Sequence, residues 1–103
     1  MSNIFSEIPD DLSAEIFEDL VESKNVKIER IISKGHSSPD VGWYDQEQNE
    51  WVIVLRGQAI LSFVDKPTIT LKEGDYIKIP AHQKHKVEWT YPDQETIWLA
   101  VHY

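Results

Sequence analysis

The sequence of 103 residues contains no cysteine, which excludes disulfides, thiolate nucleophiles and cysteine-bound metals. It has only four glycines, all scattered singly, so a glycine-rich phosphate loop is excluded as well. Basic residues are scarce, because ten Lys and Arg stand against eighteen Asp and Glu, for a net charge of −8. Nucleic acids and anionic membrane surfaces attract basic patches, so we expect neither as a partner.

Long apolar runs are also missing. No segment approaches the roughly 20 apolar residues that a membrane-spanning helix needs. Residues 1–20 have neither the basic start nor the apolar centre of a signal peptide, so we expect a cytoplasmic protein. With 41% hydrophobic residues over this length, the chain has room for one globular domain with one core.

Residues 1–25 predict a loose lead followed by a short α-helix. Pro9, Asp10 and Asp11 supply the proline and the acids that the start of a helix favours. Apolar residues then recur at helical spacing, with acidic residues between them. The apolar positions are Leu12, Ile16, Phe17, Leu20 and Val21. We expect this helix to cover one end or edge of a sheet, and a helix that binds a partner is the alternative.

Residues 26–103 predict only strands and turns. Short apolar or alternating segments are separated by turns rich in Gly, Pro and Asp. The predicted strands are 26–34, 51–55, 59–64, 68–71, 76–79, 86–90 and 96–102. Short strands at this close spacing are typical of a β-sandwich or jelly roll, so the expected fold class is all-β.

Two motifs in this region resemble the two signature motifs of the cupin family. The first ends with Glu50 and Gly57, but Tyr44 and Gln46 occupy the places of two familiar histidines. The second motif is better kept, with Gly74, Pro80 and His85 at the expected spacing. The resemblance covers residues 26–103 and implies a jelly-roll β-barrel (a double-stranded β-helix) with a metal or ligand pocket inside. It also implies a homodimer, as is common among family members of this size.

Side-chain alternation supports a shared pocket. In an extended chain, Tyr44, Gln46 and Glu50 share one face with the valines of the following strand. On another predicted strand, His85 shares a face with Trp89. A buried glutamate needs a cation, a hydrogen-bond donor or a proton, and an imidazole or a metal would meet that need.

The candidate metal ligands are Gln46, Glu50 and His85, with Tyr44 as a fourth donor or a hydrogen-bond partner. An amide oxygen, a carboxylate and an imidazole can together hold Mn, Fe, Ni or Zn in an open site. The alternative is a polar cluster at the barrel mouth that is held by hydrogen bonds and contains no ion.

Four further residues complete the list of candidates. His82, in the loop before His85, and Trp89 are expected at or near the pocket. His36 would replace a missing ligand if its loop folded inward. His102, on the strand face opposite Ile97, is expected to be structural or solvated.

These observations leave three functions open. The first is a metal-binding cupin that acts on an unknown small organic substrate, with the ion as a Lewis acid. The second is a module that binds or senses a small molecule without metal and without catalysis. The third is a structural protein whose pocket is vestigial. The small-molecule ligand itself is not identifiable from the motifs, since one fold hosts many functions.

Overall fold

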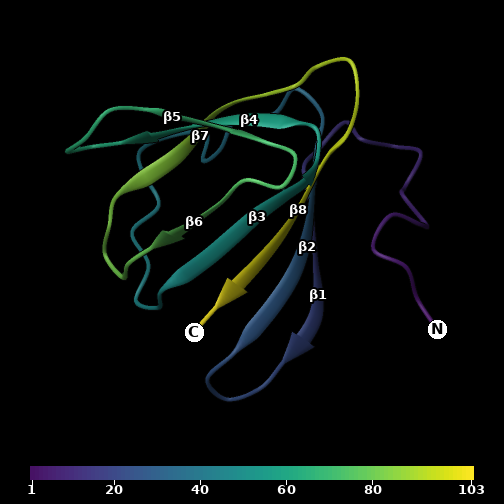
Figure 1. Ribbon diagram of the computed structural model, residues 1–103, viewed down its shortest axis with the longest axis horizontal. Coiled ribbons are helices and arrows are strands. Elements are labelled where there is room, and N and C mark those ends of the chain that lie inside the picture. Colours follow the sequence, from purple (N-terminus) through teal and green to yellow (C-terminus); the bar gives the residue numbers. More distant parts are fainter.

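The computed structural model describes residues 1–103 and contains eight β-strands and no helix (Figure 1). The strands are β1 (Ile16–Glu22), β2 (Lys27–Ser33), β3 (Glu50–Arg56), β4 (Gln58–Phe63), β5 (Ile69–Lys72), β6 (Tyr76–Ile79), β7 (His85–Thr90) and β8 (Thr96–His102). They form two antiparallel sheets, one of five strands in the order β1-β2-β8-β3-β6 and one of three in the order β5-β4-β7. The predicted all-β jelly-roll fold is therefore confirmed.

The core lies between the two sheets. Inward-facing side chains of both sheets form one cluster of ten buried residues, with Val52, Val54 and Trp98 from the larger sheet and Leu61 and Phe63 from the smaller. Side chains alternate along these strands, so the inward residues of β3 are buried while the outward ones are only partly so. This cluster fills one part of the space between the sheets, and the rest is the cavity described below.

All seven strands predicted after residue 25 are present, each within one residue of its predicted ends. Turn glycines helped to locate the ends of the predicted strands. Gly57 and Gly74 both adopt positive φ angles, of 92° and 90°, which glycine tolerates and other residues rarely adopt. They mark the chain reversals before β4 and before β6.

The predicted N-terminal helix is wrong, because residues 16–22 form strand β1 at the edge of the larger sheet. Its backbone pairs with β2 along Ile16–Glu22, with a bulge between Asp19 and Val21. Helix propensity is a weak preference, and the ladder of hydrogen bonds offered by β2 outweighs it. The bulge also explains the misleading pattern, since it breaks the strict alternation that would have marked a strand.

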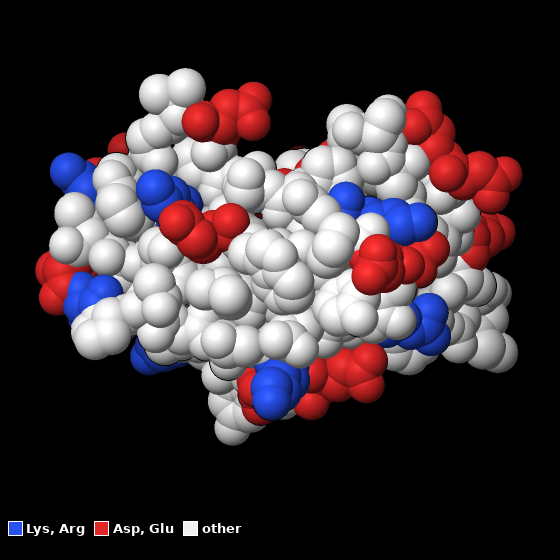
Figure 2. All heavy atoms as spheres, turned by 90° about the horizontal axis from the view of Figure 1, so that it is seen from above, with Lys and Arg blue, Asp and Glu red and all other residues white.

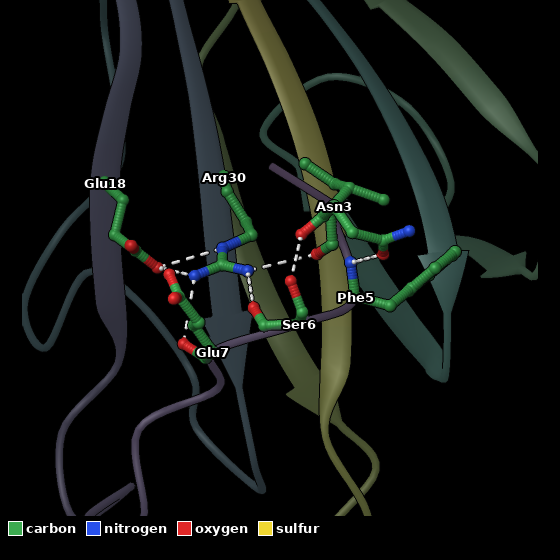
Figure 3. Close-up of polar contacts among 7 residues, drawn as sticks. Asn3, Phe5, Ser6, Glu7, Glu18 and Arg30 are labelled. Atoms are coloured by element: carbon green, nitrogen blue, oxygen red, sulfur yellow. Dashed lines mark hydrogen bonds and ion pairs between the residues drawn. The ribbon is translucent and has the colours of Figure 1, made fainter. Parts of the chain in front are cut away.

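The first residues of the chain lie on the outer face of the larger sheet, where Arg30 holds them (Figure 3). The guanidinium of Arg30, on β2, donates two hydrogen bonds to one carboxylate oxygen of Glu18, at 2.9 and 2.7 Å. It also donates to the backbone carbonyls of Ile4, Ser6 and Glu7, at 3.1, 2.7 and 3.4 Å. A buried arginine thus ties the N-terminal segment, here residues 1–8, to β1 and β2.

Two buried isoleucines lie on the same outer face of the larger sheet as Arg30. Ile32 and Ile97 are cross-strand partners on β2 and β8, and both are fully buried although they lie outside the core cluster between the sheets. Both lie on the outer face with Arg30. Ile32 is two residues from Arg30 along β2, and Ile97 is two residues along β8 from Leu99, the cross-strand partner of Arg30. The N-terminal segment that Arg30 holds lies on this side of the sheet (Figure 3).

No helix in this structure could cross a membrane, because none is long and apolar enough. On the face shown in Figure 2, acidic side chains are spread among a few basic ones, and no continuous basic patch is visible. The surface charge there follows the acidic composition of the sequence.

Candidate functional site

A cavity of about 500 Å³ opens between the two sheets. Its walls come from all five strands of the larger sheet, from β4 and β7 of the smaller sheet, and from the segment before β3. Apolar side chains such as Leu61 and Val87 line part of it. Its ionisable side chains are Glu15, Asp19, Lys27, Glu29, Glu50, Tyr44, His85 and His102. This volume is in the range of small-molecule binding sites.

The segment before β3 reaches the cavity because it pairs with β7. The backbones of Tyr44 and His85 exchange two hydrogen bonds, at 2.8 and 3.2 Å, and those of Ser38 and Val87 exchange two more, at 3.0 and 2.8 Å. These pairs extend the smaller sheet past β7. Tyr44 and Gln46 therefore line the same cavity as Glu50 and Val52, as their sequence parity predicted.

Glu50 and His85 meet inside the cavity. Glu50 begins β3 and His85 begins β7, and the two residues are 8% and 4% exposed. The Nε2 atom of His85 lies 3.5 Å from Oε1 of Glu50, and its Nδ1 atom lies 2.8 Å from the carbonyl oxygen of Gln83. A carbonyl only accepts, so Nδ1 carries a proton and Nε2 is the nitrogen that gains or loses one beside Glu50.

The charge balance around His85 raises its pKa above the ordinary value of 6.5. Burial is the largest influence and lowers this pKa, but the Glu50 carboxylate and the Gln83 carbonyl together outweigh it. Tyr44, whose ring centroid lies 5.6 Å from that of His85, has a raised pKa because burial disfavours its phenolate. The Tyr44 hydroxyl therefore stays neutral at ordinary pH.

A second carboxylate–imidazole pair, Glu29 and His102, lines the same cavity. His102 Nε2 lies 2.7 Å from Oε1 of Glu29, and both residues are buried. This hydrogen bond is the main reason that the pKa of His102 is raised. From the sequence, His102 is expected to be structural or solvated, and the structure places it in the cavity lining. The sequence signal for this position is the even spacing between His102 and Trp98 along β8, which puts both side chains on the inward face of the strand.

The two pairs form one row across the cavity wall. Glu50 and His102 are direct cross-strand partners on β3 and β8, so the order is Glu29, His102, Glu50, His85. Carboxylates and imidazoles alternate along it, and the charge of Glu50 also contributes to the raised pKa of His102. The contact between Glu50 and His85 is the weaker of the two ion pairs, because it spans 3.5 Å, whereas the contact between Glu29 and His102 spans 2.7 Å.

Trp89 lies outside this cavity, although the alternation along β7 placed it beside His85. The register between β4 and β7 shifts there, because Ile60 pairs with Trp89 while Leu61 pairs with Val87. This bulge inserts Glu88 and reverses the parity of the residues that follow. The Trp89 ring instead packs edge-on against Tyr91, with centroids 6.0 Å apart.

His82 and His36 also lie away from the cavity. His82 is exposed, has a φ of 63° and places Nδ1 2.8 Å from Asp45. His36 accepts a hydrogen bond from the backbone N–H of Lys34, at 2.9 Å, and its Nε2 lies 3.3 Å from the carbonyl of Ser13. It therefore helps to fix the loop beside the chain that enters β1, and it replaces no missing ligand.

The candidate ligands Gln46, Glu50 and His85 all line the cavity, and two of them, Glu50 and His85, are carboxylate or imidazole donors. No group of three His, Asp or Glu side chains in the structure has the geometry to hold a metal ion. Protein metal sites of the zinc and iron type take at least three such ligands with neutral or anionic donors. A set made of Glu50, His85 and the Gln46 amide has only two of these donors, so it would hold a transition metal more weakly than a set of three.

The row of charges predicts that one substitution reverses the direction of the pKa shift of His85. In Glu50→Gln, burial remains while the main stabiliser of the imidazolium is lost, so the pKa of His85 falls from above to below 6.5. His102 keeps Glu29, and its pKa falls less. Histidine ring resonances followed by NMR from pH 5 to 9 measure both values. An unchanged pKa of His85 would contradict the role given to Glu50.

The same shifts predict how stability depends on pH. A folded pKa above the unfolded one means that protonation of His85 and His102 favours the folded state. Their contribution to the free energy of unfolding is complete below about pH 6.5 and is lost as the pH rises through their folded pKa values. In Glu50→Gln, the part of this slope that comes from His85 is reversed.

Comparison with known proteins places the chain among small β-barrel proteins. The model of the cupin domain matches residues 30–102. A Ralstonia eutropha protein described as a "putative mannose-6-phosphate isomerase" is 43% identical over 99% of this chain and 95% of its own, with a TM-score of 0.93.

More distant structures share the fold alone. A cupin superfamily protein of Desulfitobacterium hafniense is 22% identical over 92% of this chain and 82% of its own, with a TM-score of 0.76. An RmlC-like cupin of Methanocaldococcus jannaschii is 20% identical over 93% and 85%, with a TM-score of 0.73. No curated protein matches the chain.

Proposed function

The chain belongs to the cupin family, and from that premise we propose that its cavity binds a small polar organic molecule without a resident metal ion. The observation that carries this proposal is the state of Glu50. It is 8% exposed, faces the cavity and has His85 at 3.5 Å as its one charged partner. A buried carboxylate with so little compensation favours a ligand that brings a donor or a positive charge.

The neighbouring groups supply the rest of a recognition site. Gln46 offers an amide with both donor and acceptor capacity, and Tyr44 offers a hydroxyl that remains protonated. Apolar side chains such as Val52 and Leu61 complete the lining. Polar groups that converge beside apolar side chains are typical of sites that bind small molecules.

Two measurements test this proposal on the purified protein. Dialysis against a metabolite extract, followed by mass spectrometry, is expected to show a small molecule retained by wild type and lost in Glu50→Gln. Glu88→Gln serves as a matched control, since Glu88 is exposed on the same strand as His85 and lies outside the cavity. Metal analysis of protein purified without chelator is expected to give substoichiometric Mn, Fe, Ni and Zn.

Two results would contradict the proposal of a metal-free binding site. Near-stoichiometric metal in wild type, lost in His85→Ala, would overturn the metal-free proposal and restore Gln46, Glu50 and His85 as ligands. Equal retention of every small molecule by wild type and Glu50→Gln would place binding elsewhere.

A second candidate is proton transfer on a sugar, in the manner of an isomerase. It is favoured by the contact between the Glu50 carboxylate and the His85 imidazole, which is a geometry used for general acid–base catalysis. The Ralstonia protein described as a putative mannose-6-phosphate isomerase also supports it. Conversion of mannose 6-phosphate to fructose 6-phosphate by wild type, absent in Glu50→Gln, would establish this candidate over simple binding.

A further inference from the structure

The charge of the cavity lining restricts the kind of ligand that it can hold. Four carboxylates line the cavity against a single lysine: Glu15, Asp19, Glu29, Glu50 and Lys27. That lysine is already engaged, because its Nζ atom lies 3.9 Å from Oε2 of Glu29. Even when His85 and His102 are both protonated, the four carboxylates outnumber the three positive groups, so the interior keeps an excess of negative charge.

The carboxylates differ in how far the protein already satisfies them. Glu29 accepts a hydrogen bond from His102 at 2.7 Å, and Glu15 accepts one from the hydroxyl of Ser33. Glu50 has only the longer contact with Nε2 of His85, at 3.5 Å, and it faces the cavity. The weakly bonded carboxylate of Glu50 marks the place in the cavity where a positively charged group of a ligand would bind. This holds whatever the number of other acidic residues in the lining.

Aromatic side chains add a second attraction for a cation. Tyr44 beside β7 and Trp98 on β8 line the cavity, and so does Phe17 on β1, which is 52% exposed. The face of an aromatic ring attracts ammonium groups, most strongly where water is excluded. Carboxylates and aromatic faces together form the usual surroundings of bound organic ammonium ions.

We propose that the ligand of this cavity is a small organic cation that carries an ammonium group. The ammonium contacts Glu50, and the aromatic rings cover its alkyl part. This inference rests on the proposed function, because it names the ligand class of the same site. It also opposes the sugar-phosphate candidate, since a phosphate ester would enter a cavity of like charge.

The structure contains none of the usual anchors for a phosphate. Its one cavity lysine is paired with Glu29, and Arg30 points to the outer face, where it holds the N-terminal segment. There is no helix, so no helix N-terminus is present to bind an anion. The four glycines are scattered and form no phosphate loop.

Isothermal titration calorimetry with four probes tests the proposal on the full chain. The probes are choline, its neutral isostere 3,3-dimethylbutan-1-ol, mannose and mannose 6-phosphate. Choline is expected to bind at least about tenfold more tightly than the isostere, because only choline gains the carboxylate and cation–π attractions. In Glu50→Gln, which keeps the shape of the side chain, choline binding is expected to weaken about tenfold. Glu88→Gln is expected to bind choline as wild type does.

The outcomes separate this inference from the proposed function. Equal binding of choline and its isostere, or no binding of choline at millimolar concentrations, overturns the cationic ligand. Binding of mannose or mannose 6-phosphate that depends on Glu50 overturns it too, while a small-molecule site in the cavity stands. If Glu50→Gln also retains every metabolite that wild type retains, the proposed function fails as well.

Discussion

Replacement of Gly57 by alanine is expected to destabilise the protein by about 3 kcal/mol or more, or to prevent folding. Two costs combine at this position. The φ of Gly57 is 92°, which an L-amino acid with a Cβ atom rarely adopts. An added Cβ would also lie 2.4 Å from Oγ1 and 2.7 Å from Cα of Thr96, which is fully buried. The second contact is with backbone, so no rotation of a side chain relieves it.

Gly74→Ala is the matched control, because Gly74 has nearly the same φ of 90° but open space around the added methyl group. Its cost is expected to be only the conformational one, about 1 kcal/mol. Urea denaturation followed by tryptophan fluorescence measures both variants. A similar loss in both would show that the approach of Thr96 contributes little. A much larger loss in Gly57→Ala supports close packing of the turn between β3 and β4.

Arg30→Ala is expected to lower the free energy of unfolding by about 3 kcal/mol. The side chain is almost entirely buried and donates to Glu18 and to three backbone carbonyls of the N-terminal segment. Its removal leaves those acceptors without their donor. It also frees the N-terminal segment from the outer face that Arg30 shares with Ile32 and Ile97. Hydrogen exchange is therefore expected to rise across residues 1–8 and at the outer face of β2.

Arg56→Ala provides the comparison, because Arg56 also contacts the N-terminal segment but is exposed. Its guanidinium lies 4.5 Å from the centre of the Phe5 ring, a contact expected to contribute no more than about 1 kcal/mol. If the two variants unfold at the same urea concentration, the network in Figure 3 is not what stabilises this part of the fold.

The N-terminal region shows where local patterns fail. Its apolar residues suited a helix, yet Ile16–Glu22 is the edge strand β1. The hydrogen bonds that decide this come from β2, and a pattern within residues 16–22 contains no information on that partner. Arg30 is a related case, because a basic residue in the middle of a predicted strand gave no sign that it would be buried by residues 4–7.

The site shows both the strength and the limit of side-chain parity. Parity correctly brought Tyr44, Gln46 and Glu50 to one cavity, because an extended chain alternates strictly. It misplaced Trp89, because a bulge near Glu88 breaks that alternation. Whether these side chains hold a metal was beyond the reach of parity, since coordination depends on distances between different strands.

The sequence by itself determined the strands after residue 25, the turns between them and the resemblance to the cupin family. These depend on local alternation and on turn residues such as Gly57 and Gly74, which act over a few positions. Only the tertiary structure decided that His102 and Glu29 join Glu50 and His85 in one row. The four residues come from four strands far apart in the chain, and the pairing of β2, β8 and β3 together with the packing of β7 across the cavity sets their neighbours.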